Sequence, residues 1–157
     1  MQYKAPIRDM KFVMHELLKF EEHYKTIPNF AETDKDTIDS FIEAGASFAE
    51  NELSPLNRTG DEEGCRFDNG QVFTPTGFKE AYKQYCELGF PSLCADEEFG
   101  GQGMPLSLGT AVSEMMGTAN WSFSMYPGLS EGAIRTLEHH GTDEQKQKYL
   151  LKLISGE

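Results

Sequence analysis

The sequence is poor in positive charge and has no long apolar run. Lys and Arg total 14 against 26 Asp and Glu, which gives a formal net charge of −12. An acidic surface repels phosphate, so this composition excludes a typical nucleic-acid-binding protein. No run approaches the roughly eighteen apolar residues of a membrane span, and the N-terminus has neither an apolar signal core nor transit-peptide character. We therefore expect a soluble, cytoplasmic protein without a membrane span.

Cysteine is also scarce. The three cysteines, Cys65, Cys86 and Cys94, are odd in number and form no C-x-x-C pair. Neither a disulfide framework nor a zinc site is therefore expected, and a reducing compartment is the default. A chain of 157 residues is long enough to bury a core as one domain.

The most distinctive stretch present is Gly103 to Ser130, in which Glu114 is the only charged residue. Its apolar character nearly all round predicts a helix covered by other helices. Asn120 is a plausible cap between this helix and a second one, from Trp121 to His140, which is rich in small residues. We therefore predict a central helical hairpin whose second arm allows a close approach by another helix or by a ligand.

Helices are predicted on the N-terminal side of this hairpin. Apolar spacing indicates an amphipathic helix from Arg8 to about Tyr24 and another from Ile38 to Leu53. Thr33 with Asp36 resembles a capping box for the second helix, and Pro55 is expected to end it.

The region from 57 to 75 is polar and Gly-rich, so we expect a long loop there, either functional or partly disordered. Within it, Asn69-Gly70 between apolar neighbours predicts the turn of a short two-stranded ribbon. A further helix is expected after Pro75, with Gly89 as its C-terminal stop.

Two more local signals complete the helical pattern. The glycines of FGGQG, Gly100 to Gly103, favour a turn over a phosphate-binding loop because no strand precedes them. Thr142 and Gln145 form a capping box at the start of the last helix. About six helices and no convincing sheet predict an all-α bundle.

Few residues suggest catalysis. His139 and His140 are neighbours on a helix and point in different directions, so they cannot share a metal ion. A buried Glu114 must be paired, for example with Arg135, or must face a cavity. No nucleophile has a base beside it, so we expect no catalytic residue and no metal site in this chain.

Three segments carry a resemblance to a known family. EEFGGQG at 97–103, SEMMGTANWSF at 113–123 and GTDEQKQKYLLKLISGE at 141–157 resemble the amino-terminal helical domain of the acyl-CoA dehydrogenases. The resemblance covers 34–157, which we expect to be the amino-terminal α-domain, and leaves 1–33 as an N-terminal helical extension.

The opening Tyr3 to Leu18 is similar to the longer bacterial branch that includes methylthiopropionyl-CoA dehydrogenase-like enzymes. The sequence departs from the family at Asp96, where a Pro is usual. The chain also stops at Glu157, before the family's β-domain and C-terminal helical domain, so we expect a fragment that is inactive alone.

For the whole enzyme, the resemblance implies FAD-dependent α,β-dehydrogenation of an acyl-CoA thioester. A carboxylate removes the α-proton, the flavin takes the β-hydride, and the electrons pass to an electron-transfer flavoprotein; a homo-oligomer is expected. The catalytic carboxylate and the main flavin contacts lie outside this chain. The expected contribution here is the wall of the acyl pocket, from Ser122, Phe123, Ser124, Met125, Pro127, Gly128 and Leu129.

A second interpretation needs no enzyme. A stand-alone acidic helical module could use the same hairpin as its core and a helix face as a partner-binding groove, without catalysis. Likewise, the small residues Ser124 and Gly128 on one helix face suit either close helix packing or an acyl tail.

Overall fold

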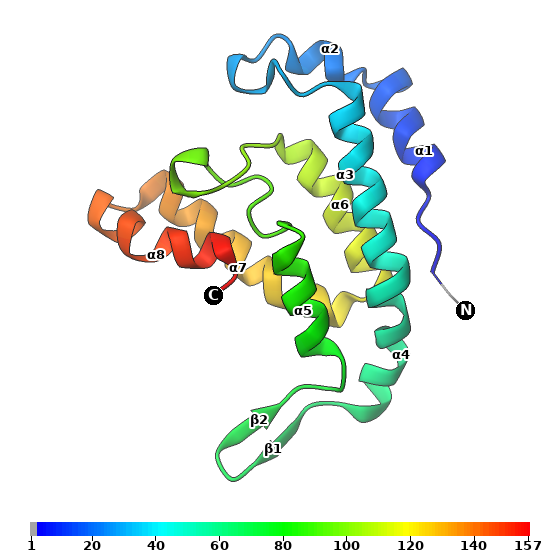
Figure 1. The fold of residues 1–157 in the computed structure, drawn as a ribbon, viewed down its shortest axis with the longest axis vertical. Helices are drawn as coiled ribbons and strands as arrows, with labels where there is room; N and C mark the ends of the chain where they lie inside the picture. Colours follow the sequence, from blue (N-terminus) through cyan, green and yellow to red (C-terminus); the bar gives the residue numbers. More distant parts are fainter. Residues whose placement is uncertain (1–2) are drawn as a thin grey trace.

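The computed structural model describes residues 3–157 and consists mainly of α-helices, so the predicted all-α class is confirmed. The helices are α1 (Ile7–Lys11), α2 (Phe20–Tyr24), α3 (Lys35–Phe48), α4 (Ser54–Glu63), α5 (Phe78–Glu87), α6 (Leu106–Ala119), α7 (Trp121–His140) and α8 (Asp143–Ser155) (Figure 1). Strands β1 (Arg66–Asp68) and β2 (Gln71–Phe73) pair antiparallel in a small ribbon. Shorter segments are π-helical (Phe12–Leu17, Ala49–Leu53) or 3-10 helical (Pro28–Phe30, Glu97–Phe99).

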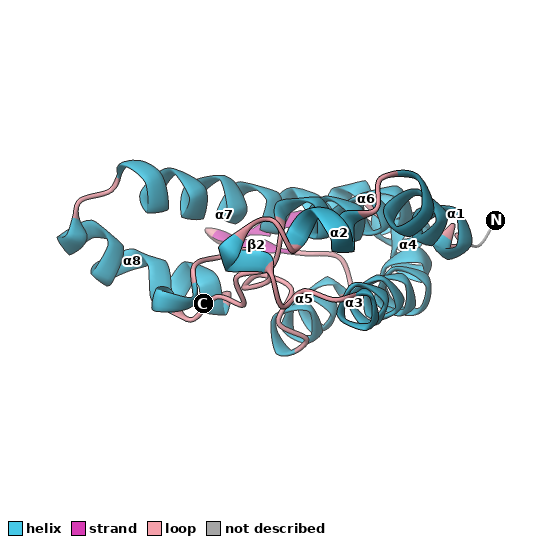
Figure 2. Ribbon diagram, turned by 90° about the horizontal axis from the view of Figure 1, so that it is seen from above, coloured by secondary structure: helices cyan, strands magenta, loops and turns pink. Residues whose placement is uncertain are grey.

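The helices form two groups that meet along α6 and α7. Helices α3 and α4 make a long curved rod with α6 beside α3 and α1 on its outer side, whereas α7 and α8 form a hairpin at the other end of the molecule (Figures 1 and 2). A Cβ atom at Gly45 of α3 would lie 3.1 Å from the methyl group of Met115, so α3 and α6 are in close contact. The ribbon projects away from both groups (Figure 1).

Two apolar clusters hold these groups together. The larger lies between α3, α5 and α6 and contains fully buried side chains such as Ile38, Ile42 and Leu108. The smaller lies under the α7–α8 hairpin and contains Ile134 and Leu150. Within residues 3–157, no helix is both long enough and apolar enough to cross a membrane.

The N-terminal segment differs from the single helix predicted between Arg8 and Tyr24. Helix α1 passes into a π-helical segment, and Lys19 then adopts a left-handed conformation with φ 50°, which separates this segment from α2. The π-helical turn still buries Met14 against the main core. Apolar spacing reports which face is buried but not a change in the hydrogen-bonding register, so the break was missed.

The predicted helix end at Pro55 is wrong, because the rod continues into α4. Pro55 occupies the first turn of α4, directly after the π-helical segment, where a missing N–H is tolerated. Residues 57–63 are therefore helical and not part of a loop. The predicted Thr33–Asp36 capping box is also wrong: Asp34 caps α3, and its Oδ1 accepts a hydrogen bond of 2.8 Å from Thr37 N.

Other local predictions are confirmed. The ribbon turns at Asn69 and Gly70, which have φ values of 49° and 81°. Thr142 and Gln145 form the capping box of α8, and Gly89 follows α5 with φ 76°. The described residues contain more α-helices than the six or so predicted. The predicted N-terminal helix is divided into α1 and α2, and α4 occupies residues that were predicted to form a loop.

Helix α6 is not covered on every side. Leu108, Val112 and Met115 are buried, but Glu114 is exposed on the opposite face. The predicted pairing of a buried Glu114 with Arg135 is therefore wrong, because Glu114 is solvated and Arg135 is paired with Glu131 on its own helix. The scarcity of charge on α6 predicted that other helices would pack around it on all sides. Among residues 3–157, no element packs over the face that carries Glu114.

Candidate functional site

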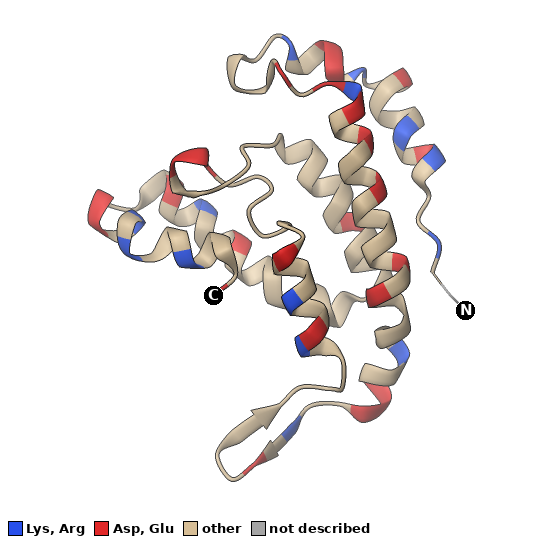
Figure 3. Ribbon diagram, viewed as in Figure 1, with Lys and Arg blue, Asp and Glu red and all other residues tan. Residues whose placement is uncertain are grey.

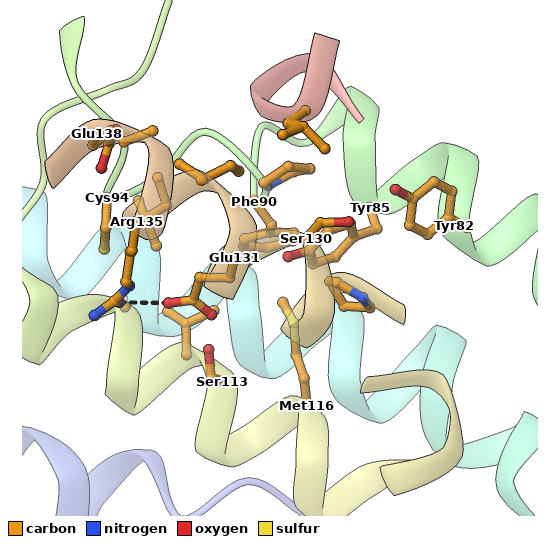
Figure 4. A pocket seen from close by; sticks show the side chains of 18 residues that line it. Tyr82, Tyr85, Phe90, Cys94, Ser113, Met116, Ser130, Glu131, Arg135 and Glu138 are labelled. Carbon is orange, nitrogen blue, oxygen red and sulfur yellow. Dashed lines mark hydrogen bonds and ion pairs between the residues drawn. The ribbon is translucent and has the colours of Figure 1, made fainter. Parts of the chain in front are cut away.

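A cavity of about 50 Å³ lies between α6 and α7, and we call it the α6–α7 cavity (Figure 4). Its remaining walls come from α5, from the segment after α5 and from α8. The side chains that line it are Tyr82, Tyr85, Phe90, Pro91, Leu93, Cys94, Ala95, Val112, Ser113, Met116, Pro127, Ser130, Glu131, Ile134, Arg135, Glu138 and Leu153, with Gly109 contributing backbone.

The segment from 90 to 95 forms one wall and is held by the glycine turn that follows it. Gln102 donates hydrogen bonds to the carbonyl oxygen of Gly89 at 2.7 Å and to Ser92 Oγ at 2.9 Å. A Cβ atom at Gly101 would overlap the carbonyl oxygen of Ala95, so only glycine fits there. The predicted turn is confirmed, and it positions Cys94 against Gly109 of α6.

The inner wall of the cavity is aromatic. Tyr85 is 9% exposed, and its ring lies 5.6 Å from that of Phe90 and 5.9 Å from that of Phe123, measured between centroids. Burial raises the pKa of the Tyr85 hydroxyl, and the nearby Glu131 charge raises it further. The hydroxyl therefore stays protonated at neutral pH, so this wall is uncharged.

The mouth of the cavity is polar. Arg135 Nη2 donates to Glu131 Oε1 at 2.5 Å (Figure 4). Glu138 Oε1 accepts a hydrogen bond of 2.9 Å from Asp96 N. Burial, followed by the charge of Glu131, raises the pKa of Cys94 to about 11. Cys94 is therefore a thiol at neutral pH and not an activated nucleophile.

The structure divides the residues predicted to form an acyl pocket. Pro127 lines the α6–α7 cavity, whereas Phe123 is 1% exposed and belongs to the main core. Phe123 also borders a wider, more open hollow of about 800 Å³ beside the ribbon. The remaining five residues line neither space: Ser122, Ser124, Met125, Gly128 and Leu129.

Several of these five lie on an open side of α7. Met125 is 48% exposed and Leu129 is 73% exposed, and a Cβ atom at Gly128 would have no neighbour within 4 Å. No helix of the described chain packs against Gly128, so the close-packing interpretation of this glycine fails within residues 3–157. A role of these residues in binding an acyl group stays a prediction.

Sequence reasoning missed Ser130, Glu131 and Arg135 as cavity residues. The available signal was their helical spacing from Pro127, because residues three, four, seven and eight positions away share or adjoin its face. Nothing in the sequence showed that this face borders a cavity. No three metal-ligating side chains among residues 3–157 lie close enough together to hold a metal ion.

The described residues form a helical domain, and the α6–α7 cavity lies between its helices. Residues 35–157 match the family model described as the acyl-CoA dehydrogenase N-terminal domain, and the chain belongs to this family. The resemblance seen in the sequence is thereby confirmed.

The chain is similar to three bacterial enzymes over nearly its whole length. It is 37% identical over 156 residues to 3-methylmercaptopropionyl-CoA dehydrogenase of Ruegeria pomeroyi, covering 99% of this chain and 26% of the relative. It is 32% identical over 163 residues to butyryl-CoA dehydrogenase of Syntrophomonas wolfei, covering 99% of this chain and 26% of the relative. It is 29% identical over 156 residues to a broad-specificity linear acyl-CoA dehydrogenase of Mycobacterium tuberculosis, covering 98% of this chain and 25% of the relative. The chain thus spans about a quarter of each relative.

Proposed function

We propose that this chain forms the N-terminal helical part of an FAD-dependent enzyme that dehydrogenates an acyl-CoA thioester, and that it supplies part of the acyl-binding wall. The observation that carries this proposal is the α6–α7 cavity, which lies beside Pro127 in a domain of this family. Acyl-CoA thioesters are the proposed substrate class because the names of the relatives refer to 3-methylmercaptopropionyl, butyryl and linear acyl thioesters.

The residues of this chain would bind and orient the acyl group and exclude water from it. Tyr85 and Phe90 supply an apolar aromatic wall, and Met116 and Ile134 face the same space. Burying an acyl chain against such side chains contributes about 0.8 kcal/mol per methylene. Ser122 to Leu129 would extend the wall along the open side of α7.

When bound, FAD supplies the acceptor for the hydride that leaves the β-carbon. No observation in the described residues marks a flavin site, because every buried polar side-chain atom among them already has a hydrogen-bond partner. We therefore assign no flavin contact and no proton-transfer step to this chain. An electron-transfer flavoprotein as acceptor and a homo-oligomeric state remain part of the proposal.

The full-length protein that contains this chain provides the test. Purified protein should carry stoichiometric flavin absorbance and should reduce a dye acceptor only when an acyl-CoA is added. A colourless protein without acyl-CoA turnover would instead favour the non-enzymatic interaction module. Residues 1–157 expressed alone should be colourless and inactive.

A further inference from the structure

The N-terminal segment carries an exposed apolar patch where it follows α1 on the outer side of α3 (Figure 1). Phe12 and Leu17 are 57% and 65% exposed, and Val13 and Leu18 are exposed as well. We call these four side chains the N-terminal patch. Single exposed apolar residues are ordinary on a protein surface, but four within residues 12–18 form a cluster. The same segment already buries Met14 in the main core, so it is apolar on two sides.

The π-helical turn gathers the N-terminal patch on one side of the segment. Leu18 N donates a hydrogen bond of 2.9 Å to the carbonyl oxygen of Val13, five positions earlier in the chain. This register turns the chain by less per residue than an α-helix does, so Phe12 comes closer to Leu17 and Val13 closer to Leu18. In an α-helix, residues five positions apart point about 140° away from each other. The π-helical turn therefore joins side chains that a regular helix would separate.

The N-terminal patch lies outside the residues that the family model matches, which are 35–157. The three relatives that match 98–99% of this chain, and therefore its N-terminal segment, are long proteins. For the Ruegeria pomeroyi enzyme, 156 residues are 26% of the length, so that protein has about 600 residues. The other two have about the same length by the same measure.

Relatives that match less of this chain are shorter. An enzyme of Clostridium acetobutylicum matches 70% of the chain over 114 residues, which are 26% of its length, so it has about 440 residues. An enzyme of Arabidopsis thaliana matches 78% over 123 residues, which are 28% of its length, so it also has about 440 residues. The long relatives thus have about 160 more residues, far more than precede residue 35 of this chain. We call the part of this excess that lies outside residues 1–157 the additional segment.

We propose that the full-length protein has such an additional segment and that the N-terminal patch binds it within the same polypeptide, through apolar side chains of that segment. Two features that the shorter relatives do not fully match, the N-terminal segment and the additional segment, would then bury each other's apolar surface. Pairing of two copies of this chain would not account for the greater length. A lipid surface fits poorly, because helices that lie on membranes are rich in Lys and Arg whereas this chain has a net charge of −12. The inference rests on the longer chain assumed in the proposed function, but not on catalysis.

Photo-crosslinking of the full-length protein tests which surface covers the N-terminal patch. With Leu17 replaced by benzoylphenylalanine, irradiation and peptide mass spectrometry should find crosslinks from this position to the additional segment of the same polypeptide. The same replacement at the exposed Arg58 of α4 is the control and should give no such crosslinks. The inference is overturned by crosslinks that join two polypeptides, by crosslinks only to parts that the shorter relatives share, by equal crosslinking from position 58, or by no crosslink at all.

A double substitution provides a second measurement on the full-length protein. Phe12→Ser with Leu17→Ser should speed tryptic cleavage within the additional segment by at least about tenfold, because the segment then separates from the patch more often. Met14 is unchanged, so the N-terminal segment itself should stay on the core. Glu22→Ser, at an exposed position of α2, is the control and should leave the cleavage rate unchanged. An unchanged rate in the double variant overturns the inference, whereas wild-type protein that turns over no acyl-CoA overturns the proposed function and leaves this inference standing.

Discussion

The side chain of Asn120 joins the start of α7 to the carbonyl oxygen of Leu53. Its Nδ2 donates to Leu53 O at 3.2 Å, while its Oδ1 accepts a hydrogen bond of 3.0 Å from Phe123 N. Asn120 is fully buried, and Leu53 ends the π-helical segment that leads into α4. One amide therefore both caps α7 and connects the α6–α7 corner to the long helical rod.

Replacing Asn120 with Ala should lower the free energy of unfolding by about 2–4 kcal/mol. Loss of the cap costs about 1 kcal/mol, and the buried carbonyl of Leu53 is left without the hydrogen bond from Asn120, at a cost of about 1–3 kcal/mol. Urea unfolding followed by circular dichroism measures the change. Asn51→Ala is the control, because the exposed Asn51 amide donates a hydrogen bond to Ser47 Oγ, one turn away on the same helical rod. A similar loss of stability in both variants would contradict the role of Asn120.

The glycines differ in what surrounds them. A Cβ atom at Gly101 would overlap the carbonyl oxygen of Ala95, so Gly101→Ala should destabilise the protein by more than about 3 kcal/mol. A Cβ atom at Gly128 has open space and helical backbone, so Gly128→Ala should stabilise by about 0.5–1 kcal/mol. Thermal unfolding of both variants measures the two changes in stability. Equal changes would contradict the prediction, because they would mean that the turn at Gly101 shifts to accommodate the added methyl group.

The N-terminal segment is attached to α3 by a charged network that should respond to acid. The carboxylate of Asp39 lies 2.7 Å from His15 Nε2 and 3.1 Å from Lys11 Nζ, and Lys11 also pairs with Glu43. Figure 3 shows basic positions on α1 beside the acidic positions of α3. Burial alone would raise the pKa of Asp39, but the hydrogen bonds from His15 and Lys11 outweigh it and hold this pKa below its usual value.

A carboxyl group with a lowered pKa stabilises the folded state above its unfolded pKa of about 4, and this contribution disappears as the pH falls through the folded pKa. Asp39→Asn should therefore reduce stability by about 1–2 kcal/mol near pH 6, and the difference from wild type should shrink below about pH 4. Unfolding measured from pH 3 to 7 tests this. Glu16→Gln, at an exposed position of the N-terminal segment, is the control. A stability difference between Asp39→Asn and wild type that does not change with pH would contradict the lowered pKa of Asp39.

A larger side chain at Gly128 tests the proposed acyl wall. A Cβ atom at Gly128 has no neighbour within 4 Å among residues 3–157, so a leucine begins in open space and the fold should be retained. In the full-length enzyme, the leucine should occupy acyl space and raise KM for longer chains more than for the shortest, by about fourfold for each excluded methylene. Steady-state kinetics over an acyl-CoA series checks this, with Thr59→Leu at an exposed position of α4, away from the proposed wall, as the control. An equal loss for all chain lengths would place Gly128 outside the acyl wall.

Features that depend on neighbours in the chain were predictable from the sequence. The Thr142–Gln145 capping box and the Asn69-Gly70 turn involve contacts within a few residues, so the residue types suffice to define them. Asn120 was identified as a cap for the same reason, but its hydrogen bond to Leu53 spans 67 residues and was not predictable. The family resemblance followed from three segments and was confirmed over residues 35–157.

Tertiary structure decided the rest. Pro55 lies inside a continuous rod because a π-helical segment precedes it, and Glu114 is exposed because no described element covers its face of α6. Glu131 and Arg135 form a regular pair on α7, but only the packing of α5, α6 and α8 around that helix makes them the mouth of a cavity. A sequence specifies which side chains share a helix face, whereas the space in front of that face depends on distant segments that pack around it.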